Sequence, residues 1–341
     1  MKRILGFVIG LFFALLLTLF AGENPWDIFL ILMRSAFGSN YDFGMTLSYT
    51  APLIFCGLAV AIGFHAGLFN IGAEGQLTLG VLAAAAVGVL LPGVPSLVAP
   101  LLAFFAAVFV GALWGGLAGW LRAYRKSHEV IVTIMLNFIA AAIASWITLS
   151  LIPNPESQNP ETAKVASQYM LTENDPIANF FPDTPANISI IFAILLAITL
   201  WIILWKTSWG YQLRAVGDNP EAAQRAGISE KKFQFLALTV AGGIAACVAL
   251  SEVMGSAGQY RVGFSPDYGF IGIAVALLAN NNPLGIIVSA FLMGALHKGA
   301  SDLDLETASI TKDFSRIIQA LVIIGVTAQG YWLWIKRKKR P

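Results

Sequence analysis

Charged residues are scarce in this sequence. Of its 341 residues only 12% are Asp, Glu, Lys or Arg, whereas 57% are hydrophobic. Soluble domains carry roughly 25% charged residues, so this chain has too few charged groups to cover a surface that faces water. The composition excludes an ordinary soluble domain and indicates a protein whose solvent is lipid.

Cysteine and histidine are also rare, and their placement predicts no metal site. Cys56 and Cys247 lie inside apolar segments without ligand spacing, and we expect both to be small packing residues. His65 and His297 are isolated from other ligand types. We therefore expect this chain to bind no metal ion and no cofactor of its own.

Catalytic signatures are missing as well. The sequence has no Gly-x-x-x-x-Gly-Lys-Ser/Thr phosphate loop and no recognisable Ser/His/Asp constellation. The chain is therefore expected neither to hydrolyse ATP nor to act as an enzyme. Its net charge of +2 gives no basic surface for nucleic acid.

Long apolar runs, by contrast, are abundant. A helix that crosses the hydrocarbon core needs about 20 mainly apolar residues. Windows of that length predict about ten spans, at 4–22, 47–66, 71–91, 97–121, 129–152, 187–206, 233–253, 266–282, 284–300 and 314–335. The pair within 266–300 is interrupted by Asn280-Asn281-Asn282-Pro283, so one or both members are expected to be half-helices or a re-entrant pair. The predicted fold is an all-α polytopic transmembrane bundle that forms one domain over 1–341.

The N-terminal run 4–22 can be a retained span or a secretory signal, and its length favours the span. Pro25–Phe37 is too short to cross, and we expect an outer interfacial helix there.

Basic residues predict the orientation, because they concentrate in cytoplasmic loops. With the N-terminus inside, alternate counting places these residues in the cytoplasm: Lys2, Arg3, Arg122, Arg125, Lys126, Lys206, Arg214, Arg225, Lys231, Lys232 and the tail Lys336–Arg340. The loop at about 153–186 falls outside and carries five acidic residues against Lys164 alone. Both termini and the loop at about 207–232 are then cytoplasmic.

That cytoplasmic loop predicts one short helix with strong end signals. They are a capping Asp218 or Asn219, Pro220 at the first helical position, Glu221 in the first turn and Gly227 as a left-handed exit. A two-turn helix is not stable alone. We therefore expect a partner to pack on the small face formed by Ala222, Ala223 and Ala226.

Glu221-Ala222-Ala223 followed by Gly227 resembles the EAA loop of bacterial ABC-transporter permeases, the element that docks onto the ATP-binding subunit. No Ile-x-Leu-Pro follows, which departs from the maltose-type class and favours the branch of ribose, branched-chain amino-acid and nucleoside permeases. The resemblance assigns contact with the ATP-binding subunit to Gly217, Asp218, Asn219, Pro220, Glu221, Ala222, Ala223 and Gly227.

Three further stretches resemble that branch, in the same order along the chain: His65–Gln76, His128–Asn137, and Gly269–Leu278 running to Asn282-Pro283-Leu284-Gly285. The match is nearest to nucleoside-type permeases that work with a non-identical second permease. It implies a multi-pass permease of a bacterial inner membrane that imports nucleosides. The implied partners are a cytosolic subunit that binds ATP and Mg²⁺, a second permease chain or copy, an extracytoplasmic substrate-binding protein and lipid.

Polar side chains at membrane depth need a reason, because they are costly there. Asn70, Glu74 and Gln76 begin a helix after a Gly-rich break, and Thr133 and Asn137 share a helix face. Two interpretations stay open for each of the five: a bonded structural role, or a place on the translocation pathway, since half-helix ends recur at transport sites.

Polar and aromatic residues near the predicted outer ends of the spans also allow two interpretations. Glu252 and Arg261 can pair or contact a gate. Aromatic residues near them can stack on a base or anchor the interface; they are Tyr260, Phe264, Tyr268 and Phe270.

A faint internal repeat is present. Gly57–Ile62 resembles Gly272–Leu277, and each is followed by a polar break. Duplicated halves with broken helices point to a transport site, although Gly/Ala/Val-rich sequence also produces such matches by chance. Two alternatives to the nucleoside importer remain: a simple-sugar ABC importer, or an ion-coupled secondary transporter for which Glu74 and Glu252 are the candidate carboxylates.

Overall fold

The computed structural model describes residues 2–171, 175–307, 309–311, 314 and 316–325, and the elements found there are helical apart from two isolated bridges. The main elements are α1 Lys2–Leu17, α2 Pro25–Phe37, α3 Asn40–His65, α4 Ala73–Leu90, α5 Ala99–Arg125, α6 Glu129–Ser150, α7 Pro176–Phe180, α8 Ser189–Lys206, α9 Ser208–Asp218, α10 Pro220–Arg225, α11 Glu230–Ala246, α12 Ala249–Glu252 with a π-helical turn Val253–Ala257, α13 Tyr268–Leu278 and α14 Pro283–Glu306. A short apolar helix follows at Arg316–Gly325. The predicted all-α class is confirmed.

Among the described residues, seven helices are long and apolar enough to cross a membrane, or eight if one bent pair counts as a span. The seven are α3, α4, α5, α6, α8, the continuous stretch Glu230–Ala257, and α14. The prediction of about ten spans is therefore not confirmed.

Three predicted spans account for the difference. The run 4–22 ends at the left-handed Gly22, after which Asn24 and Pro25 begin α2, so Gly6–Ala21 and Pro25–Phe37 meet at 119°. The run 266–282 contains α13, whose 11 residues reach only about 16 Å at 1.5 Å per residue. The run 314–335 extends past Gly325, and its remainder lies outside the described residues, as does the basic tail Lys336–Arg340.

The predicted interruption between α13 and α14 is confirmed. Asn280 and Asn281 both adopt left-handed backbone angles, with φ of 58° and 57°, which ends α13. Asn282 then accepts a hydrogen bond from the Leu284 amide at 3.0 Å, with Pro283 at the first helical position. The break leaves α13 as a short helix and α14 as a full-length one.

Small residues let α5 and α11 approach closely. A Cβ added at Gly115 of α5 would lie 2.2 Å from the Leu238 carbonyl oxygen, and one at Gly111 would lie 2.5 Å from that of Gly242. In lipid, where no hydrophobic force drives helices together, such close backbone packing is a main source of association.

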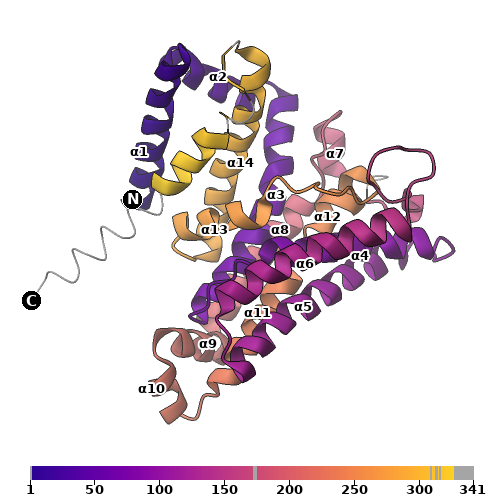
Figure 1. Cartoon of the computed structure of the whole chain (residues 1–341), viewed down its shortest axis with the longest axis vertical. Coiled ribbons are helices and arrows are strands. Elements are labelled where there is room, and N and C mark those ends of the chain that lie inside the picture. The colour runs from indigo at the N-terminus through magenta and orange to yellow at the C-terminus, as the bar shows by residue number, and fades with distance from the viewer. Residues whose placement is uncertain (1, 172–174, 308, 312–313, 315, 326–341) are drawn as a thin grey trace, which may run out of the picture.

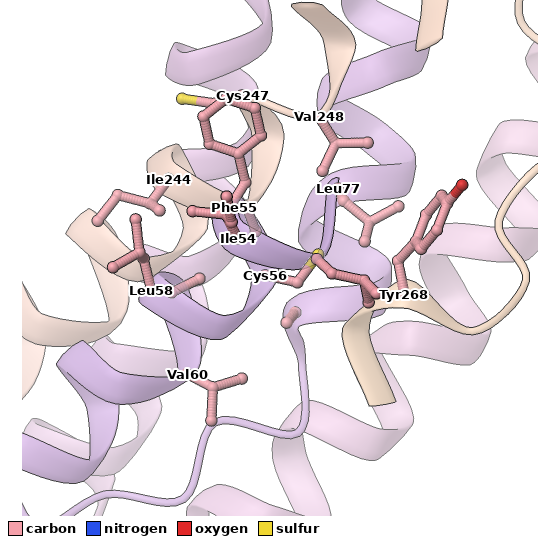
Figure 2. Close-up of a cluster of buried hydrophobic side chains, with 14 of the residues drawn as sticks. Ile54, Phe55, Cys56, Leu58, Val60, Leu77, Ile244, Cys247, Val248 and Tyr268 are labelled. Atoms are coloured by element: carbon pink, nitrogen blue, oxygen red, sulfur yellow. The ribbon is translucent and has the colours of Figure 1, made fainter. Parts of the chain in front are cut away.

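The core lies where α3, α4, α11 and α13 meet (Figure 2). Helix α3 is buried along most of its length and crosses α13 at two glycines. A Cβ on Gly57 would contact Val275 at 2.8 Å, and one on Gly272 would contact Cys56 at 2.7 Å. The two segments of the faint internal repeat therefore pack against each other.

The loops assigned to opposite sides of the membrane lie at opposite ends of the bundle (Figure 1). At one end of α3, the Asn40 side chain donates to the Phe180 carbonyl of α7 at 2.9 Å. At the other end, His65 Nε2 lies 2.9 Å from the Asn281 carbonyl oxygen. Helix α8 runs from the 153–186 loop to α9. Which end faces the cytoplasm, and the location of both termini, remain predictions.

Candidate functional site

The predicted short helix in the 207–232 loop is confirmed as α10, preceded by the amphipathic α9. Asn219 is the cap that forms: its side-chain oxygen accepts a hydrogen bond from the Ala222 amide at 3.1 Å. Pro220 is the first helical residue, and Gly227 follows the helix with a φ of 81°. Because a Cβ on Gly227 would meet nothing within 4 Å, the left-handed angle is what favours glycine there.

The packing of α10 buries one of the three alanines within 222–226 and leaves the other two exposed. Ala223 is buried, at 4% exposed, while Ala222 and Ala226 are exposed together with Glu221. The face available to a partner thus comprises Glu221, Ala222 and Ala226, and Ala223 holds the helix to its own chain.

Helix α9 connects this face to the end of α3. A Cβ added at Gly217, near the end of α9, would lie 2.3 Å from the His65 carbonyl oxygen and 2.8 Å from the Gly67 amide nitrogen. Gly67 itself has a φ of 71°. We call this close approach the Gly217–Gly67 contact. It places the cytoplasmic loop of the sequence prediction directly against the break between α3 and α4.

Side-chain amides hold that break together. Asn70 and Gln76 exchange two hydrogen bonds, at 3.0 and 3.1 Å, and both are fully buried. Asn137 of α6 accepts from the Gly75 amide at 2.9 Å and donates to the Ile71 carbonyl at 3.0 Å. The motifs His65–Gln76 and His128–Asn137, distant in sequence, are joined here.

Of the predicted pathway residues, Thr133 donates within its own helix to the Glu129 carbonyl at 2.8 Å. Together with Asn70, Gln76 and Asn137 it forms part of the tight packing around the break. These hydrogen bonds give the residues a structural role, which is one of the two interpretations that the sequence left open. A place on the translocation pathway stays a prediction for these four residues.

Glu74 connects the break to α13. Its carboxylate accepts a hydrogen bond from the Gly269 amide at 2.7 Å and also makes a hydrogen bond with the Ser265 side chain. A Cβ on Gly269 would lie 2.4 Å from the Glu74 amide nitrogen, so the two backbones touch. The first turn of α13 leaves free amides, and Glu74 supplies an acceptor for one of them from α4.

A cavity of about 1110 Å³ opens beyond the start of α13, toward the 153–186 end. It is bounded by α3, α12 with its π-helical turn, the 258–267 loop, α13, α14 and the Arg316–Gly325 helix. Its lining mixes charge with aromatic rings: Tyr49, Glu252, Arg261, Phe264, Asp267, Tyr268, Phe270, His297, Arg316 and Gln319. Small-molecule sites usually occupy about 300–1,000 Å³.

Sequence reasoning had singled out several lining residues, but not as members of one site. Glu252, Arg261, Phe264, Tyr268 and Phe270 all line the cavity, whereas Tyr260 does not. Tyr49, Arg316 and Gln319 were missed. A signal existed for the last two, because a cation and an amide three residues apart share a face of an otherwise apolar helix.

The 153–171 stretch packs against the 258–262 segment beside the cavity. The Thr162 amide donates to the Tyr260 carbonyl at 2.9 Å, and the Glu161 carboxylate lies 3.3 Å from the Arg261 guanidinium. Gln259 also donates to Glu161, at 2.7 Å. A hydrogen bond from Ser157, with others from Asn154 and Arg261, holds the pKa of the Glu161 carboxyl below its usual range.

Over the part of the chain that the structure describes, no cluster of three or more His, Cys, Asp or Glu side chains can hold a metal ion. Cys56 and Cys247 are buried free thiols within the core, which agrees with their predicted packing role.

The chain is similar in sequence to several ABC transporter permease proteins. A family model described as Branched-chain amino acid transport system / permease component matches residues 42–327. The guanosine ABC transporter permease protein of Bacillus subtilis is 34% identical over 329 residues, covering 95% of this chain and 92% of the relative. The nucleoside ABC transporter permease protein NupB of Lactococcus lactis subsp. cremoris is 32% identical, covering 96% and 90%. The glucose ABC transporter permease protein TsgB13 of Haloferax volcanii is 32% identical, covering 91% and 82%.

Proposed function

Because the chain belongs to the family of branched-chain amino acid transport system permease components, we propose that it is the membrane subunit of an ATP-driven importer that carries nucleosides across a bacterial inner membrane. Two of its relatives are named for guanosine and nucleoside transport and align with nearly the whole chain. Their substrates and the cavity lined by both polar groups and aromatic rings support a nucleoside as the cargo.

The observation that carries the coupling role is the exposed face of α10 at one end of the bundle (Figure 1). A separate cytosolic subunit, which holds ATP and Mg²⁺, docks on Glu221, Ala222 and Ala226. Movement of α10 displaces α9, and the Gly217–Gly67 contact transmits the displacement to the break between α3 and α4. The hydrogen bond between Glu74 and the Gly269 amide then connects the break to α13, whose first turn borders the cavity.

The remaining partners occupy the other surfaces. Exposed apolar side chains on α5, α6 and α8 suit lipid or a second permease chain, either homologous or identical; examples are Phe105, Phe109, Phe138 and Leu195. An extracytoplasmic binding protein delivers the substrate to the end of the bundle that carries the 153–186 loop.

A simple sugar is the second candidate cargo, because one relative is named for glucose transport at 32% identity. Uptake of labelled guanosine, uridine, ribose and glucose by cells that express the whole system separates the two. Nucleoside uptake that stops when ATP is depleted supports the proposal. Uptake of glucose or ribose alone supports the sugar importer, and uptake that persists without ATP indicates an ion-coupled transporter.

A further inference from the structure

The signs of the charges in the cavity wall restrict what the cavity can hold. Carboxylates come from Glu252 and Asp267, and guanidinium groups from Arg261 and Arg316. Arg261 is already paired with Glu161 at 3.3 Å. A wall with both signs gives no field that would gather an ion of either sign, and a phosphate would face two carboxylates. The cavity therefore suits an uncharged polar molecule and excludes a nucleotide.

Glu252 offers the most specific recognition group. It ends α12, is half-buried in the cavity wall, and is hydrogen-bonded to Tyr268. The Tyr268 ring is anchored in the core beside Cys56 and Leu77 (Figure 2), which fixes the position of its hydroxyl group. A carboxyl group accepts hydrogen bonds at both of its oxygens. After one bond from Tyr268, it can still accept from two neighbouring hydroxyl groups.

Aromatic rings complete the lining. Phe270, in the first turn of α13, lines the cavity and is 42% exposed, so its ring is available for stacking. Tyr49 also lines it, edge-to-face with His297 at 4.6 Å between ring centroids. A molecule with a flat ring at one end and vicinal hydroxyl groups at the other matches both features, and a ribonucleoside has this chemistry.

We propose that this cavity, within a single permease chain, binds the ribonucleoside during transport: the Glu252 carboxylate accepts hydrogen bonds from the ribose hydroxyl groups and the Phe270 ring stacks on the base. The assignment rests on the proposed function. It makes the permease itself, in addition to the external binding protein, selective for ribose over deoxyribose. A site built to bond a hydroxyl group discriminates strongly against the analogue that lacks it.

The test compares uptake of labelled guanosine and 2′-deoxyguanosine by the complete transporter in vesicles. Both ligands saturate the binding protein, and ATP is supplied on the side of the vesicle membrane that carries the ATP-binding subunit. The variants are Glu252→Gln and, as a matched control in the outer loop, the exposed Glu156→Gln. Because the binding protein is the same in every sample, any change in the ratio of the two uptake rates comes from the permease.

We expect Glu252→Gln to lower guanosine uptake by about tenfold or more and to bring the guanosine-to-deoxyguanosine ratio close to one, because one acceptor oxygen is replaced by an amide NH₂ that can only donate. Glu156→Gln should keep the wild-type ratio. An unchanged ratio in Glu252→Gln would overturn the assignment while leaving nucleoside import intact. Absence of ATP-driven guanosine uptake in the wild-type complex would instead overturn the proposed function.

The aromatic half of the site has its own pair of variants, which decides the matter if Glu252→Gln does not assemble. Phe270→Ala removes the ring and should lower guanosine uptake by about tenfold. Phe270→Tyr keeps the ring and should retain most of the wild-type rate. Equal rates for Phe270→Ala and wild type, per assembled complex, would contradict stacking at this position.

Discussion

At Gly217 the absence of a side chain allows the 207–232 loop to lie directly against the end of α3. A methyl group there would lie 2.3 Å from the His65 carbonyl oxygen, closer than atoms can approach. The backbone of α9 or of the α3–α4 break has to move to accept it, and overpacking of this kind costs about 1–3 kcal/mol.

Gly217→Ala is therefore expected to lower the thermal unfolding temperature of the purified transporter by a few degrees and to reduce ATP-driven uptake. Gly93→Ala is the matched control, because a Cβ there would meet nothing within 4 Å. Thermal scans and uptake assays on both variants check the prediction. Wild-type stability and uptake in Gly217→Ala would show that the close approach does not constrain the protein.

Glu161 makes the attachment of the 153–171 loop sensitive to pH. Its pKa is held low by the hydrogen bond from Ser157 and by those from Asn154 and Arg261. A carboxyl whose pKa is lower in the folded state stabilises that state above its unfolded pKa of about 4.3. This contribution is lost as the pH falls through the lowered value.

Amide hydrogen exchange over 153–171, corrected for the intrinsic pH dependence of exchange, should show constant protection from pH 7 to about 5 and a decrease below about 4. Glu161→Gln should have weaker protection at pH 7 and lack the decrease at acidic pH. The exposed Glu156→Gln should behave as wild type. Protection that is equally strong in Glu161→Gln at neutral pH would refute this role.

At the scale of elements, α13 depends on a carboxylate from another helix. The Asp267 side chain caps none of its first amides, whereas Glu74 of α4 accepts from the Gly269 amide at 2.7 Å. Removing the acceptor leaves a buried amide without its partner, which costs about 1–3 kcal/mol.

Glu74→Ala is expected to lower stability by that amount, and Glu74→Gln, which keeps an acceptor oxygen, to retain most of it. Unfolding of the purified complex measures both. The same pair tests the pathway prediction for Glu74: a purely structural cap leaves uptake by Glu74→Gln near wild type. Stable Glu74→Gln with lost uptake would instead indicate that the negative charge takes part in transport.

At the scale of the whole molecule, the sequence predicted helix ends and breaks well, because they depend on the backbone preferences of a few neighbouring residues. The cap at Asn219, the exit at Gly227 and the break at Asn280–Pro283 follow from backbone preferences of those residues. The number of spans did not follow from apolar length alone. Gly22 and Pro25 turn the chain sharply, and α13 is apolar because it is buried by other helices, although it is too short to cross a membrane.

The cavity could not be predicted because its wall comes from segments far apart in sequence. Glu252, Tyr268 and Arg316 belong to three different helices, and only tertiary packing brings them together. Likewise, the burial of Ala223 and the exposure of Ala222 depend on how α10 packs on its neighbours. The positions of Ala222, Ala223 and Ala226 in the sequence do not reveal which of them faces outward.

Docking of the ATP-binding subunit on α10 is tested most directly by ATP-dependent guanosine uptake in vesicles that contain the complete transporter with Ala222→Arg. The large cation on the exposed face should reduce uptake by about tenfold or more, because an unpaired charge buried in an interface costs several kcal/mol. Ala222→Ser, which keeps a small uncharged side chain on the same exposed face, is the control and should transport normally. Wild-type uptake by Ala222→Arg would contradict coupling through α10.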